Sequence, residues 1–257
     1  MDFITDLPPS LALLKKPPQK LYYKGDLSLL NAPKVAIVGS RACTQYTKNL
    51  VLKLAATLAK RGVCVVSGAA IGVDIYAHEG AFPRTIAVFG NGLNAVYPAQ
   101  NARQIAQIYE RGLALSEYEP DASPANWTFL ERNRIVVALS NAVVVAQADA
   151  KSGSMSSAKL ALSMNIPLFT LPQRLEESRG TNELLREGKA RLITDFDEFA
   201  AEFGGEIDSN LNPPDELLDF VDSHPNFDEC YARFGERLFE YEIEGKIAID
   251  GVFVRAL

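Results

Sequence analysis

The stretch that decides the fold is VAIVGSR (residues 35–41), which a similar unit, VVSGAAIGVDIYAH (residues 65–78), follows. In each unit a fully apolar segment, typical of a buried parallel strand, leads into small residues and then into a predicted helix. Small residues at such a turn let backbone N–H groups approach an anion at the helix N-terminus. Arg41 adds a guanidinium with a fixed fork of donors for phosphate oxygens. Both units therefore favour phosphate binding, to a nucleotide cofactor or to a nucleic-acid backbone.

A regular alternation of strand and helix patterns extends this arrangement over most of the chain. The sequence predicts strands at residues 34–38, 63–67, 85–89, 113–116, 142–146, 167–171 and 190–192. It predicts helices at residues 46–60, 74–81, 102–109, 127–139, 156–164, 181–187 and 195–203. Most of the strands are continuous apolar runs, which suit a parallel sheet covered on both faces. The predicted fold is α/β: an extended Rossmann-like, doubly wound, mostly parallel sheet with its ligand at the carboxyl ends of the strands.

Local composition divides the chain into four segments. Residues 1–33 are Pro-rich and predict an N-terminal extension packed on the core, with a short helix and then an extended stretch. Residues 34–205 form the Rossmann-like domain, and residues 206–213 are a polar linker. Residues 214–257 predict three short helices and a hairpin at Asp250-Gly251. Three helices and a hairpin indicate a small winged-helix-like domain.

Composition and charge narrow the functional classes. The content of 47% hydrophobic and 23% charged residues is that of an ordinary globular protein. No apolar run reaches the roughly 18 residues that span a bilayer, and the N-terminus lacks the features of a signal peptide. We therefore expect a cytoplasmic protein without a membrane partner. Three widely spaced cysteines and two histidines favour neither a disulfide framework nor a metal site.

The charge is unevenly distributed. Residues 206–257 carry 13 acidic and 4 basic side chains, a net −9. The remaining 205 residues carry 32 − 13 = 19 acidic and 26 − 4 = 22 basic side chains, a net +3. A polyanion should therefore prefer the large domain to the acidic C-terminal segment.

The segment WTFLERNR (residues 127–134) is the most distinctive part of the sequence. On a helix Phe129, Arg132 and Asn133 share one face, where an aromatic plane beside a guanidinium and an amide suits base stacking and phosphate contact. Arg134 points about 160° away from Arg132 on the helical wheel. The alternative is structural: Phe129 belongs to the core, and the arginines pair with carboxylates such as Glu131.

Three loops supply the remaining candidate residues. The first contains Gly39, Ser40 and Arg41, the second Ser67 and Gly68, and the third Lys151, Ser152 and Gly153. All three follow predicted strands, so they should converge on the same edge of the sheet. Each loop also suits a purely structural interpretation, as a helix cap or a site of close strand–helix packing.

The chain offers little for catalysis. It lacks the GxxxxGK[ST] motif, so a nucleoside triphosphatase of the P-loop type is not indicated. No Ser/His/Asp or Cys/His arrangement is indicated, and His78 is better suited to packing between elements than to acting as a base. The loop ends also lack the carboxylate cluster of a two-metal nuclease. We therefore expect a binding protein with no catalytic residue, metal or cofactor.

Taken in order, the motifs identify a family resemblance. VAIVGSR, SGAAIGVDIYAH, VFGNGLNAVYP, FLERNRIVVALSNAVVVAQADAKSGS and TNELLREGKA resemble the DNA-processing protein A family, also called DprA or Smf. The resemblance implies a protein of natural transformation that binds single-stranded DNA through its Rossmann domain, forms a homodimer, protects incoming DNA and helps to load a RecA-type recombinase. The residues that match the family's DNA-contacting blocks are Gly39, Ser40, Arg41, Phe129, Arg132, Asn133, Arg134, Lys151, Ser152 and Gly153.

The chain departs from the family pattern at three places, and one other function stays open. Thr44-Gln45-Tyr46-Thr47, Gln147-Ala148 and Pro172-Gln173 stand where the family usually has Ser/Thr-x-Tyr-Gly, Glu-Ala and Pro-Gly. The main alternative is a nucleotide-processing enzyme of the phosphoribohydrolase type, which resembles this fold. Such enzymes carry a PGGxGT block with a following glutamate, and the comparable KSGSMSSA (residues 151–158) has neither. A dinucleotide-binding sensor is a third option, which the unusual placement of the glycines disfavours.

Overall fold

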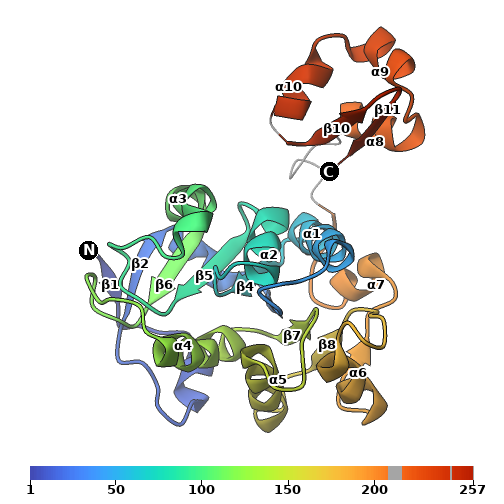
Figure 1. Ribbon diagram of the computed structural model, residues 1–257. Coiled ribbons are helices and arrows are strands. Elements are labelled where there is room, and N and C mark those ends of the chain that lie inside the picture. Colours follow the sequence, from blue (N-terminus) through green and yellow to red (C-terminus); the bar gives the residue numbers. More distant parts are fainter. Residues whose placement is uncertain (208–215, 244, 257) are drawn as a thin grey trace. The chain divides into compact units, whose positions relative to one another are not determined.

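One nine-stranded sheet organises most of the chain. The structure, a computed structural model, describes residues 1–207, 216–243 and 245–256, and it divides into two compact units, Met1–Asp208 and Ser209–Leu257. In the first unit the strand order is β1-β2-β6-β5-β4-β3-β7-β8-β9 (Figure 1). The strands from β6 to β9 pair in parallel, whereas β2 is antiparallel to β6 and to β1. The predicted Rossmann-like, mostly parallel sheet is confirmed.

The elements of this unit follow the predicted alternation. The strands are β1 (Phe3–Ile4), β2 (Leu21–Gly25), β3 (Lys34–Val38), β4 (Cys64–Ser67), β5 (Thr85–Phe89), β6 (Leu113–Ser116), β7 (Ala142–Val145), β8 (Leu168–Thr170) and β9 (Arg191–Leu192). The helices are α1 (Gln45–Lys60), α2 (Val73–Ala81), α3 (Ala102–Arg111), α4 (Asn126–Ala138), α5 (Gly153–Ser163), α6 (Arg179–Arg186) and α7 (Phe196–Ala201), with short 3₁₀ helices at Pro9–Leu13, Leu27–Asn31 and Ala99–Asn101. No end of an element predicted within residues 34–205 is wrong by more than three residues.

The central strands are apolar on both faces because each face has its own core. In β3, Val35 and Ile37 are fully buried against α1 and α2. Ala36 and Val38 alternate with them and pack into the opposite core, with α4 and α5. Figure 1 shows this as two helical layers, with α1, α2 and α3 on one side of the sheet and α4, α5 and α6 on the other.

The sheet reverses its winding direction beside β3. From β3 the chain adds β4, β5 and β6 on one side, and it then returns to add β7, β8 and β9 on the other. The loops that leave the carboxyl ends of β3 and β7 therefore turn to opposite faces and leave a crevice between them, where doubly wound folds bind ligands.

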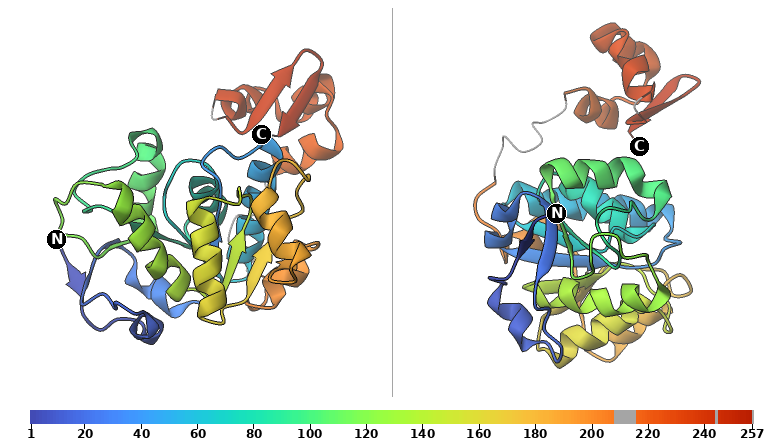
Figure 2. Two further views of the ribbon diagram at one scale, coloured as in Figure 1. Left: turned by 60° about the horizontal axis from the view of Figure 1, so that its bottom comes forward. Right: turned by 90° about the vertical axis from the view of Figure 1, so that its left-hand side faces the viewer.

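The N-terminal segment does more than pack on the core. The sequence predicts only a short helix and an extended stretch in residues 1–33, whereas β1 and β2 extend the sheet beyond β6 by antiparallel pairing. Leu21 and Tyr22 are both buried there, which explains why the segment joins the sheet. Figure 2 shows these first strands at the edge of the sheet opposite to α6 and α7.

The second unit is small and has its own core. It contains α8 (Glu216–Ser223), α9 (Phe227–Phe234), α10 (Arg237–Ile243), β10 (Ile247–Asp250) and β11 (Phe253–Ala256). The predicted three helices and hairpin are therefore present, although Asp250 pairs with Phe253 and the turn is Gly251-Val252. Of the predicted linker, residues 208–213 lie outside the described part of the chain. In the part that the structure describes, no helix is long and apolar enough to cross a membrane.

Candidate functional site

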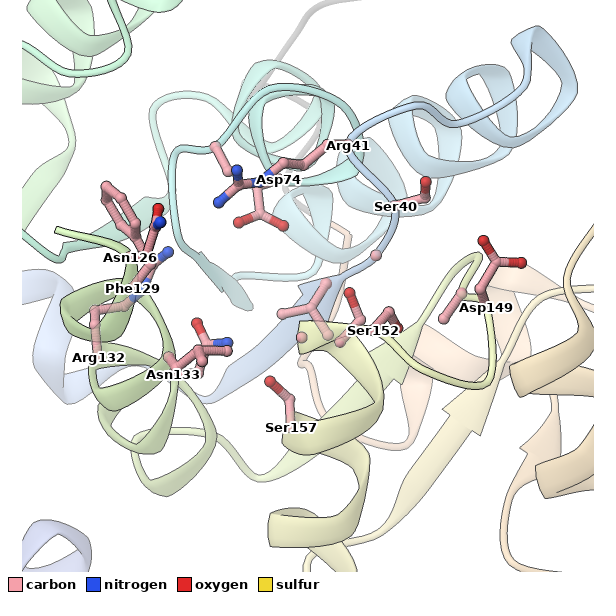
Figure 3. A pocket seen from close by; sticks show the side chains of 17 residues that line it. Ser40, Arg41, Asp74, Asn126, Phe129, Arg132, Asn133, Asp149, Ser152 and Ser157 are labelled. Atoms are coloured by element: carbon pink, nitrogen blue, oxygen red, sulfur yellow. The ribbon is translucent and has the colours of Figure 1, made fainter. Parts of the chain in front are cut away.

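A cavity of about 390 Å³ opens at the carboxyl ends of the central strands, where the winding reverses. Four segments that are distant in sequence line it: residues 38–41 after β3, Ala70 and Asp74 at the start of α2, the first two turns of α4, and residues 148–157 after β7. Figure 3 shows the labelled side chains of these segments around one common space. The convergence expected from the sequence thus occurs for the first and third loops and for α4.

The loop after β3 is held from both sides. The Ser40 N–H donates to the carbonyl of Gln147 (2.8 Å), and the Ser40 carbonyl accepts from the Val73 N–H (3.1 Å). Gly39 is required because a Cβ there would lie 2.6 Å from Cγ2 of Val73. The sequence predicts that amides of this loop are free for an anion. In the structure the Ser40 amide is already bonded to Gln147, whereas the Arg41 guanidinium reaches the cavity.

The three departures from the family pattern meet behind this loop. Oε1 of Gln147 accepts from the backbone N–H of Thr44 (3.0 Å), which caps the N-terminus of α1. Nε2 of Gln173 donates to Oγ1 of Thr47 (2.9 Å) and to the carbonyl of Ala146 (2.8 Å). These bonds connect the β3–α1 loop with the segments after β7 and β8, and they hold one wall of the cavity in place.

The N-terminus of α5 forms the opposite wall. Ser152 is its N-cap and accepts from the Met155 N–H (3.3 Å), and Ser152, Gly153 and Ser154 all line the cavity. The first amides of a helix have no partner within the helix and carry its positive dipole end. This wall therefore offers an anion both hydrogen-bond donors and a favourable electrostatic field.

An aromatic stack borders the cavity on the α4 side. Phe129 is half-buried, and its ring stacks on Tyr97 with centroids 5.4 Å apart and planes at 18°. The Arg41 guanidinium carbon lies 5.8 Å from the centre of the Phe129 ring. A second cavity of about 130 Å³ adjoins this stack, and Arg41, Phe129 and Tyr97 line it as well.

Arg132 lines the cavity but is engaged inside the protein. It is 3% exposed, it donates to the carbonyl of Val88, and it lies close to the carboxylate of Asp74. A Cβ on Gly68 would lie 2.1 Å from Nη1 of Arg132, so this glycine gives the guanidinium its place. Burial raises the pKa of Asp74, and the charge of Arg132 opposes that rise. Arg132 lines both cavities at the strand ends and Gly68 lines the smaller one, so both lie at the site, with the Arg132 guanidinium largely buried.

Three predicted residues, Arg134, Ser67 and Lys151, do not line either cavity at the strand ends. Arg134 is on the other side of α4 and pairs with Glu117, which corresponds to the structural alternative considered from the sequence. Ser67 is fully buried and donates to the carbonyl of Ile37 (2.6 Å). Lys151 is exposed beside the lining residue Ser152 without lining the cavity itself. Gly39, Ser40, Arg41, Phe129, Asn133, Ser152 and Gly153 are all lining residues.

The sequence interpretation missed several lining residues. Asn126 lies three residues before Phe129, and Leu130 lies one residue after it. Together with Asn133 they form one stripe along α4. The spacing of this stripe was the available signal. Asp149 and Tyr97 come from loops, where the sequence carries no periodicity that shows which side chains face inward.

The charges of the site are closely balanced. Asp74 is buried beside Arg132, close to Ser67 and to the backbone of the loop before α2. Asp149 is exposed and lines the cavity. The negative charge of Asp74 offsets the positive charge of Arg132, which leaves Arg41 as the cation of the lining that has no acidic neighbour of this kind. The lining therefore combines the Arg41 guanidinium and the N-terminus of α5 with a flat aromatic surface at Phe129.

Comparison with known proteins identifies a family for the chain. A family model described as DNA recombination-mediator protein A matches residues 4–204. The DNA processing protein DprA of Streptococcus pneumoniae is 40% identical over 191 residues, which are 72% of this chain and 67% of that protein. Protein Smf of Escherichia coli is 39% identical over 74% of this chain, and the match spans about half, 52%, of that longer relative.

Two solved structures share the fold. DNA processing protein A of Helicobacter pylori, described for its single-stranded DNA binding mode, superposes with a TM-score of 0.76 at 50% identity and covers 78% of this chain and 94% of that one. DprA of S. pneumoniae superposes with a TM-score of 0.75 at 36% identity and covers 80% and 75%. Because the family model matches most of the chain, this protein belongs to the DNA recombination-mediator protein A family, also known as DprA or Smf.

Proposed function

We propose that the first unit binds single-stranded DNA in the larger of the two cavities at the strand ends, of about 390 Å³ and called the large cavity below. The observation that carries this proposal is the position of Arg41, which lies over Phe129 and lines the same cavity as the N-terminus of α5. A phosphate between Arg41 and the α5 amides satisfies both, and the aromatic ring beside them offers a surface for the attached base. A concave site of this kind favours a strand whose bases are unpaired, because a duplex keeps its bases stacked inside.

The role that we propose follows the family. The protein would protect incoming single-stranded DNA during natural transformation and promote its loading with a RecA-type recombinase, acting as a homodimer and without catalysis. The second unit is proposed to be winged-helix-like. Because residues 206–257 carry a net −9, we assign it to protein contacts or assembly and not to DNA binding.

Replacement of Arg41 tests the site. Arg41→Ala removes a charge-assisted contact, so the affinity for oligo-dT should fall by about 1.5–3 kcal/mol, as measured by fluorescence anisotropy. Arg111→Ala is the matched control, because Arg111 is also exposed and also lies over an aromatic ring, Phe82, at 5.2 Å. Equal affinity of the two variants and the unchanged protein would remove Arg41 from the site.

Salt dependence tests the kind of ligand. Each phosphate contact with a single strand should contribute a slope of about −0.7 to the plot of log affinity against log salt. We expect a negative slope that becomes shallower by about one such contact in Arg41→Ala, and weaker binding of duplex than of single-stranded DNA at every salt concentration. Tighter binding of the duplex would contradict the proposed preference.

A further inference from the structure

Trp127 is exposed in a way that the fold does not require. It is the only tryptophan of the chain and the second residue of α4, and 63% of its surface is accessible. Tryptophan is on average one of the more buried residues of globular proteins, and an exposed one is often a contact residue. Trp127 does not line either cavity at the strand ends.

Tyr118 braces the indole. Trp127 packs nearly perpendicular to Tyr118, with ring centroids 6.1 Å apart and planes at 79°. Tyr118 is itself fixed, because its hydroxyl donates to Glu131 (3.0 Å) and its N–H donates to Oγ of Ser116 (3.1 Å). An aromatic ring held in this way loses little conformational freedom when a second ring stacks on it.

Trp127 continues the rim of the large cavity. Its chain neighbour Asn126 and the residue three positions later, Leu130, both line that cavity. Residues three apart on a helix are surface neighbours, so Trp127 and the 58% exposed Leu130 form an apolar lip that extends outward from the cavity. Figure 3 shows Asn126 at the start of α4, on the border of the cavity.

We propose that Trp127 is a second stacking site, which takes an unpaired base of the nucleotide next to the one held in the cavity. This inference rests on the proposed function. The lip fits a nucleobase because it is flat, apolar and continuous with a site for phosphate, and every base has a face that stacks on an indole. Glu131 follows Trp127 by four residues on α4, and its carboxylate repels phosphate, so we expect the strand to reach the indole across Asn126 and Leu130.

The single tryptophan gives a direct readout. An oligo-dT of about 12 nucleotides is titrated into the full chain while its anisotropy and the tryptophan emission are recorded in the same samples. We expect the emission to be quenched with the same midpoint as the anisotropy change. Thymidine 5′-monophosphate, which is long enough only for the cavity, should leave the emission unchanged.

Variants separate stacking from an indirect change in emission. Trp127→Leu should lower the affinity for the oligonucleotide about tenfold, the loss expected for one stacked base, and Trp127→Phe should restore most of it. Phe3→Leu is the matched control, because Phe3 is 53% exposed and packs edge-on against Tyr22 with centroids 5.9 Å apart. This control should bind like the unchanged protein.

The outcomes distinguish this inference from the function on which it rests. Oligonucleotide binding with unquenched emission, or with equal affinity of Trp127→Leu and the unchanged protein, would overturn the stacking site and leave the cavity site intact. Absence of any anisotropy change with the unchanged protein would contradict the proposed function itself.

Discussion

Three arginines near the site have different surroundings, which determine what each can do. Arg41 is exposed and lies over an aromatic ring, Arg132 is buried between Val88 and Asp74, and Arg134 pairs with Glu117. Arg132 and Arg134 are two positions apart on α4, so they leave the helix on different sides. Arg41 is the only one of the three whose side chain is exposed, so its guanidinium is the one that an incoming phosphate reaches directly.

The buried arginine should be sensitive to its glycine neighbour. In Gly68→Ala the new Cβ would lie 2.1 Å from Nη1 of Arg132, so the guanidinium must leave its place. We expect urea unfolding to show a loss of about 1–3 kcal/mol and oligo-dT affinity to fall. Gly205→Ala, where a Cβ meets nothing within 4 Å, is the control and should change neither quantity. Normal stability of Gly68→Ala would show that the guanidinium moves at no cost.

His78 is a buried, neutral histidine whose tautomer is set by its partners. Its Nε2 accepts from the Ala69 N–H (3.2 Å), so Nδ1 carries the proton and donates to Oγ1 of Thr85 (2.6 Å). Thr85 in turn donates to the carbonyl of Val65 (3.1 Å). Burial, and secondarily the charge of Arg132, lowers the pKa of His78 to about 3. The expectation that His78 packs between elements is confirmed.

This histidine predicts a loss of stability in acid. Below an ordinary pKa of about 6.5 the unfolded chain binds a proton that the folded chain refuses, so stability falls as the pH drops towards 3. From pH 7.5 to pH 5 the contribution of His78 should be a loss of about 2 kcal/mol, measured by urea unfolding with tryptophan emission as the probe. His78→Gln should lack this part of the pH dependence, whereas His224→Gln, at an exposed histidine, should keep it. An unchanged pH dependence in His78→Gln would assign the acid sensitivity to other groups.

At the scale of elements, the α5 N-terminus combines a structural and a proposed binding role. Ser152 caps α5 at the cavity, and Asp195 caps α7 through a bond from the Glu198 N–H (2.9 Å) away from the cavity lining. Ser152→Ala and Asp195→Ala should each lower the free energy of unfolding by about 0.5–2 kcal/mol. Anisotropy should show weaker oligo-dT binding for Ser152→Ala only. Equal DNA affinity of the two variants would place the phosphate elsewhere.

The elements that the sequence predicts well are those with a strong local signal. The strand at residues 34–38 is apolar on both faces and its predicted bounds are those of β3. The helix at residues 156–164 begins three residues earlier in the structure, because Ser152 acts as its cap and the small residues that follow carry no apolar periodicity. Strands β1 and β2 were missed because β1 has two residues and β2 owes its state to pairing with β6, which is distant in sequence.

The site was predictable in part for the same reason. Loops that follow buried strands had to meet at one edge of the sheet, and the lining positions of Arg41 and Gly153 follow from that rule. The burial of Arg132 could not be predicted from the sequence of α4. It depends on the nearby Asp74 and on the space that Gly68 leaves by having no side chain, and both residues come from other segments. Tertiary neighbours decide whether a lining cation is available.

At the scale of the molecule, two units with opposite net charge share one chain. Each has its own core, and residues 1–205 carry +3 against −9 for residues 206–257. A chain that ends at residue 207 should therefore fold and should bind oligo-dT at least as tightly as the full chain does. Any gain in affinity over the full chain should vanish at high salt. The isolated segment 206–257 should not shift DNA in a mobility assay at physiological salt. Loss of binding by the shortened chain would assign the second unit a direct part in the site.

The discontinuous lining of the large cavity has a consequence for synthesis. Its four segments lie between residues 38 and 157, and they meet only after β7 has taken its place beside β3. A nascent chain that has left the ribosome only as far as α4 contains Phe129 and the loop after β3. It still lacks α5, whose N-terminus forms the opposite wall of the cavity. Capture of a ribosome-bound chain by immobilised oligonucleotide would therefore mark the moment at which the central sheet is complete.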